Sequence, residues 1–309
     1  MIGAKAVANV EKNDSEPRKR NSIARWGRLL LVSKTGTVGL IIVVLVTLVA
    51  IFADVLTPHN PAQNNLQDML KPPFWEEGGS TTYILGTDNL GRDILSRIII
   101  GTRVSLMVGV FSVLVAGVVG MIIGIVAGYY GGIIDNVLMR IVDAFLAIPS
   151  ILFILVVLAV FEPSILVLIL VIGFTNWVSY ARVVRGEVLS VKEREFVKAS
   201  RSIGTKNRVI MVKHVLPNVI SSFIVISAMS VATAIILEAS LSFLGLGIQP
   251  PDVSWGSMLT DGRNYLATNW WLATFPGIAI TITVLGIILL GDWIRDVLDP
   301  RIQTKGGGK

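Results

Sequence analysis

The residues whose types and spacing point most directly to a function lie at 195–218, in the stretch EFVKASRSIGTKNRVIMVKHVLPN. Four of them fall on one face of a helix and form a small apolar stripe: Phe196, Ala199, Ser200 and Ile203. Lys198 and Arg201 point away from that stripe. The sequence offers no paired nucleophile and base, so the chemistry that this stretch predicts is binding and not catalysis.

The same stretch breaks at Gly204, which follows the last residue of the stripe as a helix-ending glycine does. We expect Thr205 to cap a second short helix. That helix has an apolar face of its own, made of Val209, Val212 and Leu216. Pro217 then suits the first turn of the segment that follows. The stretch is therefore predicted to be a hairpin of two short helices joined at a glycine.

Such a hairpin has two interpretations. It can lie on a membrane surface, held there by anionic lipid. Alternatively, it can be the docking point for a cytoplasmic protein. A membrane anchor does not require two rigid helices joined at a fixed elbow, so the arrangement weakly favours docking. The residues alone leave both interpretations open.

The elements that must hold this hairpin are predicted to be membrane-spanning helices. Of the 309 residues, 53% are hydrophobic and 16% are charged, whereas soluble domains carry about 25% charged residues. A helix of about 20 residues crosses a hydrocarbon core of about 30 Å, and backbone groups in lipid must bond internally. Uncharged apolar runs of sufficient length lie at 34–54, 103–135, 143–162, 162–182, 214–238 and 263–292. The sequence predicts an all-α integral membrane protein with about six transmembrane helices.

The basic residues predict the orientation, because basic loops stay in the cytoplasm. They gather at 1–34 and 182–213, whereas 57–102 and 241–268 hold few for their length. Both termini and the hairpin are then expected in the cytoplasm. Since topology accounts for the net charge of +6, we expect no nucleic-acid partner.

The expected segments follow from these runs. They are a cytoplasmic tail at 1–34, a first transmembrane helix at 35–56, an extracytoplasmic segment at 57–102, a core of five transmembrane helices at 103–293 with a cytoplasmic loop at 183–217, and a cytoplasmic tail at 294–309. Within the first tail, residues 22–34 are amphipathic and suit an interfacial helix, although a disordered basic tail is an equal alternative.

Three patterns bear on how the spans pack. Small residues recur every fourth position in the second run, at Ala116, Gly120, Gly124 and Gly128. This stripe predicts close approach of another helix, which is ordinary membrane packing or, less favoured, a tight pair beside a pathway. Pro149 should kink the third run. Arg140 and Asp143 are spaced to pair on one helix face.

The 195–218 stretch resembles the EAA loop of binding-protein-dependent ABC transporter permeases. That motif runs Glu-Ala-Ala, three residues, Gly, nine residues and Ile-x-Leu-Pro. Its positions fall here on Lys198, Ala199, Ser200, Gly204, His214, Leu216 and Pro217. Lys198, Ser200 and His214 depart from the motif, although Glu195 lies one helical turn before Lys198.

Further segments are similar to the dipeptide, oligopeptide and nickel permease group, in the same order along the chain. They are LGTDNLGRDILSRIIIGTRVSL, ARVVRGEVLSVKEREFV, EASLSFLGLG and GDWIRDVLDPR. The resemblance spans nearly the whole chain from about residue 25 and is closest to the "C"-type permease of the pair.

The resemblance implies the ABC importer type I permease fold and a subunit that translocates dipeptides or oligopeptides, with nickel chelates as the alternative. It implies a homologous second permease, two ATP-binding subunits and an extracytoplasmic binding protein, in a bacterial or archaeal cell (inner) membrane. In that family the EAA helices enter a cleft on the ATP-hydrolysing subunit. The residues implied in this coupling are Glu195, Phe196, Lys198, Ala199, Ser200, Ile203, Gly204, Leu216 and Pro217.

This chain is expected to be a transport subunit without an ATPase site or cofactor of its own. It has no phosphate-binding loop of the G-x-x-x-x-G-K-[ST] type, so ATP and Mg²⁺ are expected on the partner subunits. His59 and His214 are expected on opposite sides of the membrane, so no shared metal site is predicted.

Glu238 opens EASLSFLGLG, where the fifth run should reach the outer interface. It is either an interfacial residue solvated by water, or a carboxylate at the pathway mouth that attracts the ammonium end of an arriving peptide. A self-sufficient channel or secondary transporter is the rival function. It predicts a charged residue near mid-membrane, which the runs lack. A structural membrane subunit without a pathway is the second rival.

Overall fold

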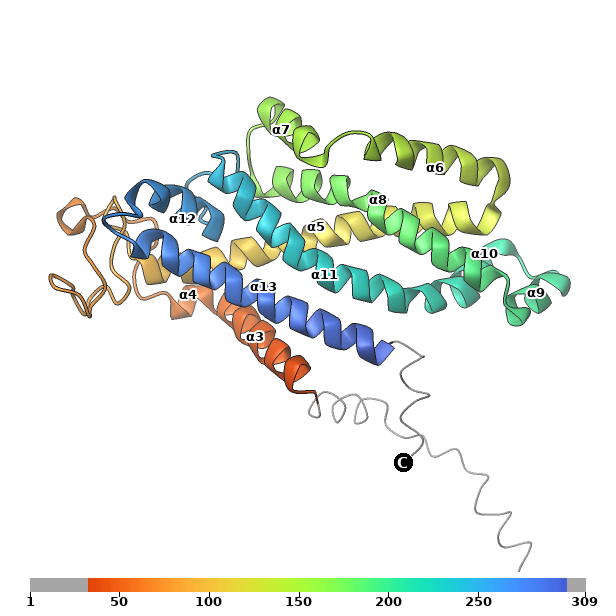
Figure 1. The fold of residues 1–309 in the computed structure, drawn as a ribbon, viewed down its shortest axis with the longest axis horizontal. Helices are drawn as coiled ribbons and strands as arrows, with labels where there is room; N and C mark the ends of the chain where they lie inside the picture. Colours follow the sequence, from red (N-terminus) through yellow and green to blue (C-terminus); the bar gives the residue numbers. More distant parts are fainter. Residues whose placement is uncertain (1–32, 299–309) are drawn as a thin grey trace, which may run out of the picture.

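A computed structural model describes residues 33–298, and the regular elements within that range are helices (Figure 1). The longer ones are α3(Lys34–Ile51), α5(Ile94–Tyr130), α6(Gly132–Leu146), α7(Ser150–Val160), α8(Ile165–Lys192), α11(Leu216–Phe243) and α13(Trp271–Leu298). The shorter ones are α4(Ala53–Leu56), η1(Leu66–Asp68), α9(Glu195–Ser202), α10(Asn207–Ile210), η2(Met211–Val215), α12(Trp255–Gly262) and η3(Arg263–Tyr265). The tail expected at 1–34, with its interfacial helix, lies outside the described residues except for 33 and 34.

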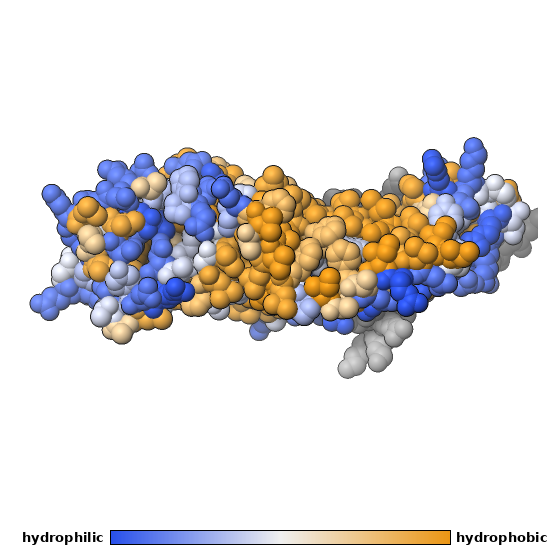
Figure 2. Space-filling model, turned by 90° about the horizontal axis from the view of Figure 1, so that it is seen from above, coloured by the Kyte–Doolittle hydropathy of each residue, from blue (hydrophilic) through white to orange (hydrophobic). Residues whose placement is uncertain are grey.

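The two ends of the molecule carry different elements. Residues 57–93 and α12 lie at one end, which we name the outer end, and α9 lies at the opposite inner end (Figure 1). Between them, the face seen in Figure 2 shows a broad apolar belt with hydrophilic side chains at both ends. A belt of this kind is what a chain needs to sit in a hydrocarbon layer.

The predicted number of spans is confirmed, with one difference. Five helical segments are long and apolar enough to cross a membrane, and α6 with α7 makes a sixth only as a pair bent by 79°. Pro149 was expected to kink one continuous helix, but it separates two helices. Proline lacks an amide hydrogen and disfavours helical backbone in the residue before it, so the chain turns there.

Helices extend beyond the apolar runs that predicted them. The α5 helix begins at Ile94, inside the segment expected to be extracytoplasmic, because the Asp93 side chain accepts a hydrogen bond from the Ser96 amide at 2.9 Å and caps it. The α8 helix continues to Lys192, into the cytoplasmic loop expected at 183–217. The α13 helix continues to Leu298, so the tail expected from 294 starts inside a helix. Charged residues mark the edge of the hydrocarbon and not the end of a helix.

The small-residue stripe of α5 packs against α8, as ordinary membrane packing predicts. A Cβ atom at Gly120 would lie 2.5 Å from the carbonyl oxygen of Trp177, and one at Gly124 would lie 2.7 Å from that of Ala181. These two glycines let the α5 and α8 backbones touch.

We expect Gly120→Ala to lower the thermal stability of the purified chain. The added methyl would also lie 2.4 Å from the Tyr180 Cβ, so the helices must separate, and overpacking of this kind costs about 1–3 kcal/mol. Gly186 of α8 is the matched control, since a Cβ there meets no atom within 4 Å. Equal unfolding temperatures for Gly120→Ala and Gly186→Ala would contradict the packing assigned to α5 and α8.

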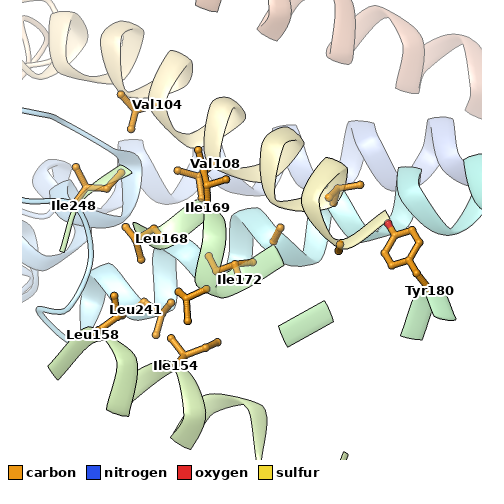
Figure 3. Packing of buried hydrophobic residues seen from close by; sticks show 14 residues of the cluster. Val104, Val108, Ile154, Leu158, Leu168, Ile169, Ile172, Tyr180, Leu241 and Ile248 are labelled. Carbon is orange, nitrogen blue, oxygen red and sulfur yellow. The ribbon is translucent and has the colours of Figure 1, made fainter. Parts of the chain in front are cut away.

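The largest apolar cluster joins four helices near the outer half of the molecule. In Figure 3, Val104 and Val108 of α5 face residues of α7 and α8, and Leu241 of α11 closes the cluster. The α7 and α8 members that the figure labels are Ile154, Leu158, Leu168, Ile169 and Ile172. This cluster holds the bent α7 against the long helices.

Charged side chains fasten the outer end. Arg97 of α5 donates to Asp88 at 2.9 Å and to Asp261 of α12 at 3.0 Å. Arg92 donates to the same two carboxylates, at 2.6 and 3.1 Å. The network joins the 57–93 segment, α5 and α12, and its four charges cancel in pairs.

Asp143 of α6 has a different partner from the one its spacing suggested. It accepts a hydrogen bond from Arg182 of α8 at 2.6 Å, so its ion pair links two helices. The expected pairing of Asp143 with Arg140 is wrong, because α8 runs beside α6 and offers a guanidinium at closer range.

Candidate coupling site

The first helix of the hairpin forms and ends as its sequence predicts. The α9 helix stops at Ser202, and Gly204 follows with φ +75°, a conformation that glycine adopts at low cost. The Gly204 amide donates to the Arg201 carbonyl at 3.0 Å, and the Thr205 amide donates to the Ser200 carbonyl at 3.1 Å. This pair of bonds is the Schellman arrangement, which gives the hairpin a fixed elbow.

The second arm of the hairpin differs from the prediction. The expected Thr205 cap is wrong, since α10 begins at Asn207 after Lys206 without a side-chain cap. Nor is this arm a separate helix, because α10, η2 and α11 together form one segment, Asn207–Phe243, that is long enough to span a membrane. Whatever moves the elbow therefore acts directly on the fifth span.

Pro217 explains the wide π-helical turn η2 in that segment. Proline cannot donate to the carbonyl four residues earlier and its ring crowds that group, so the helix widens just before it. The Asn218 side chain donates to the His214 carbonyl at 2.7 Å, which satisfies an acceptor in the widened turn. Pro217 lies in the first turn of α11, as predicted.

The predicted stripe of α9 lies at the surface. Phe196, Ala199 and Ile203 are exposed, with 81% of Ile203 accessible. The ring of Phe196 lies 6.1 Å from that of His214, so two positions of the motif-like stretch meet across the hairpin. Glu195 is exposed in the first turn of α9, and the Ser200 hydroxyl donates to the Phe196 carbonyl.

Lys198, which stands where the motif has glutamate, pairs with Glu193 at 2.9 Å. The hydrogen bond from Lys198 holds the pKa of Glu193 below its usual range, so the Glu193 carboxylate stays charged at neutral pH. Leu216 is partly buried at the start of α11.

The side of the hairpin that packs inward was missed by sequence reasoning. Val197, Ile210, Val215 and Val219 are buried with Tyr129 of α5 and with valines of α8. Val209 and Val212, two residues of the apolar face predicted for the second arm, are exposed and do not belong to this buried side. The sequence does contain a sign of this buried side, because Val197 is an apolar residue outside the stripe, in a turn that also holds charged residues. Tyr129 lies far away in the sequence, and no local pattern links it to the hairpin.

Glu238 lies at the outer end and its surroundings correct both expectations made for it. Its side chain is fully buried, so it neither meets water nor opens to a pathway mouth in this conformation. Ser242 and Ser254 each donate to its carboxylate at 2.7 Å, and Ser105 lies 3.5 Å from it. These serines come from α11, from the cap of α12 and from α5, so Glu238 ties three elements together.

A cleft of about 570 Å³ opens beside the buried Glu238 and its serine partners. Arg92, Arg97 and Asp261 of the charged network line it, with Asn89 and Gln249. Within residues 33–298, no group of three histidine, cysteine or acidic side chains could hold a metal ion. The outer end thus presents a polar cleft, while the inner end presents a cationic hairpin with exposed apolar side chains.

Comparison with known proteins agrees with this arrangement. Residues 120–304 match the model of the family described as "Binding-protein-dependent transport system inner membrane component", and residues 24–73 match "N-terminal TM domain of oligopeptide transport permease C". The dipeptide transport system permease protein DppC of Escherichia coli (strain K12) is 46% identical over 271 residues, which cover 88% of this chain and 90% of that protein. The oligopeptide transport system permease protein OppC of Bacillus subtilis (strain 168) is 38% identical, over 96% of each chain.

The fold is also that of a solved transporter subunit. A chain of the MetNI methionine ABC transporter, in a structure of inward-facing conformations, superposes with a TM-score of 0.54 at 18% sequence identity. The match covers 66% of this chain and 96% of that one, and confirms the ABC importer type I permease fold. With its family match over more than half its length, the chain belongs to the binding-protein-dependent transport system inner membrane components, as a multi-pass membrane permease.

Proposed function

We propose that the chain is one permease subunit of an ATP-driven importer that carries short peptides. It pairs with a homologous permease, binds two ATP-hydrolysing subunits at its inner end and receives peptide from an extracytoplasmic binding protein at its outer end. ATP and Mg²⁺ are held by the partner subunits. The complex lies in a bacterial or archaeal inner membrane, with the inner end of this chain in the cytoplasm.

One observation carries this proposal. The hairpin exposes Phe196, Ala199 and Ile203 to solvent on a rigid elbow, while its other face is buried against the ends of α5 and α8. Exposed apolar side chains on a fixed element suit a protein groove better than a lipid surface, since they stand beyond the apolar belt. The arm after the elbow continues into a transmembrane helix, so movement of a docked partner can move that helix directly.

Peptides are favoured over nickel chelates by the relatives. Two proteins that are similar over most of the chain are named for dipeptide and oligopeptide transport. The polar cleft at the outer end suits a hydrated, zwitterionic cargo or the protein that delivers it, since it offers guanidinium, carboxylate and amide groups.

Reconstitution tests the function. The chain is purified with its second permease and ATPase subunits and placed in vesicles with the binding protein outside. We expect uptake of radiolabelled dipeptide that requires ATP within the vesicles and disappears when this chain is omitted. Peptide uptake that continues without ATP would favour a self-sufficient channel or secondary transporter.

The orientation is tested by thiol labelling, which the absence of cysteine from the chain makes simple. Single cysteines replace Asn64 and Ser202, both of which are exposed. An impermeant maleimide added to intact cells should label position 64, and should label position 202 only after the membrane is opened. Labelling of position 202 in intact cells would reverse the orientation.

A further inference from the structure

Tyr129 lies where the inner end of α5 meets both arms of the hairpin. It is 5% exposed and packs with the valines of α8 and the buried face of the hairpin. Its hydroxyl donates to the Asn207 side chain, on α10, at 2.9 Å. The Arg201 guanidinium, on α9, lies over its ring at 5.4 Å from the centroid. One side chain of α5 thus contacts the chain on each side of the Gly204 elbow.

The inner end of α5 is fastened in a second place. Lys192, the last residue of α8, donates to the Gly128 carbonyl at 2.9 Å. This bond joins two long helices and does not involve the hairpin. Ile125 of α5 also packs against the buried face of the hairpin, whereas Tyr129 adds a hydrogen bond and a cation–π contact between α5 and the hairpin.

From Tyr129, α5 runs without a break to the outer end. Its 37 residues make a rod of about 55 Å. At the far end of the rod Arg97 binds Asp261, and the Ser105 hydroxyl accepts a hydrogen bond from the Trp255 amide at 3.3 Å. Both partners belong to α12, beside the outer cleft. A displacement of the inner end of α5 is therefore expected to shift α12.

We propose that Tyr129 is the positioning residue through which the hairpin moves α5, and through α5 the α12 helix at the outer cleft. This inference rests on the proposed function, because it assigns a route to the movement that the ATPase subunits drive. The phenolic hydroxyl and the ring have separate tasks. The hydroxyl holds α10 through Asn207, and the ring holds α9 through Arg201.

The test measures peptide transported per ATP hydrolysed by the reconstituted complex. Tyr129→Phe keeps the ring and loses the hydrogen bond, and should lower this ratio about fivefold, the effect of one ordinary hydrogen bond. Tyr129→Leu also loses the ring and should lower it further. Asn207→Leu should match Tyr129→Phe, and the double variant should be no worse than either. Tyr130→Phe is the control, since Tyr130 is the neighbouring residue and is exposed.

A second measurement reports on the hairpin without transport. Spin labels at Ile122 of α5 and Ser202 of α9, both exposed, should give one narrow distance distribution in the wild-type chain and a broad one in Tyr129→Leu. A narrow distribution in Tyr129→Leu, or an unchanged transport-to-ATP ratio in both Tyr129 variants, would overturn the proposal. Failure of the wild-type complex to couple uptake to ATP would instead count against the proposed function, and the label distances would still decide whether Tyr129 holds the hairpin.

Discussion

Gly204→Pro will reduce ATP-driven peptide uptake at least tenfold while the chain remains in the membrane. Proline fixes φ near −65°, whereas Gly204 has φ +75°. The substitution also removes the amide that donates to the Arg201 carbonyl. The elbow must open, so α9 turns away from the partner groove, yet the apolar contacts that hold the spans are untouched. Uptake per chain, normalised to the amount in the membrane, measures the effect.

Two further variants separate the effect of the positive φ angle from the effect of adding a side chain at position 204. No atom lies within 4 Å of a Cβ placed at Gly204, so a side chain has room. Asparagine tolerates positive φ better than other residues, and Gly204→Asn should keep most of the uptake. Gly204→Val should lose most of it, because a β-branched residue resists that angle. If proline, valine and asparagine all transport normally, the elbow has no part in coupling.

Glu238→Leu will lower the thermal stability of the chain more than any other substitution considered for the outer end. The carboxylate accepts bonds from Ser242 and Ser254, and leucine leaves these buried hydroxyls without their acceptor. Each abandoned buried group costs about 1–3 kcal/mol. The expected fall in unfolding temperature is roughly 5–15 °C, measured on the purified chain in detergent.

Glu238→Gln should lose much less, because the amide oxygen can still accept from a serine. Glu162→Leu is the control for replacing a carboxylate with an apolar side chain, since Glu162 is exposed between α7 and α8. An unfolding temperature for Glu238→Leu within a degree or so of the control would show that the serine contacts do not stabilise the fold. In that case the carboxylate would need another role.

Much of this fold could be predicted because lipid permits few solutions. Apolar runs bounded by charges located the spans, and spaced small residues located the face of α5 that another helix approaches. That this helix is α8 was not predicted. The bend at Pro149 was predicted in place but not in size, since its 79° angle depends on the packing of α7 against α8. Helix ends were missed by the same rule, because α5 begins at the Asp93 cap and α8 ends at Lys192, both beyond the uncharged runs that hydropathy detects.

The candidate site also has features that the sequence predicts and features that it does not. The Gly204 elbow and the exposed stripe are local features, so sequence predicted them. Tyr129 was missed because its contact with Asn207 joins residues far apart in the chain, and no local pattern marks it. Glu238 was predicted near the end of its span, and it lies in the last turns of α11, but its burial was not foreseen. Ser242 lies one turn further along the same helix, but Ser105 and Ser254 come from other elements, and only the fold brings them to Glu238.

The central claim is that the exposed stripe of α9 docks into an ATP-hydrolysing subunit. Photo-crosslinking tests it most directly, with benzoylphenylalanine placed at Ile203, the most exposed residue of the stripe. Illumination of the assembled complex should join this chain to the ATPase subunit in high yield, and the same group at Asn64 on the outer end should not. A crosslink from position 64 to the ATPase, or one from position 203 to lipid alone, would contradict the account.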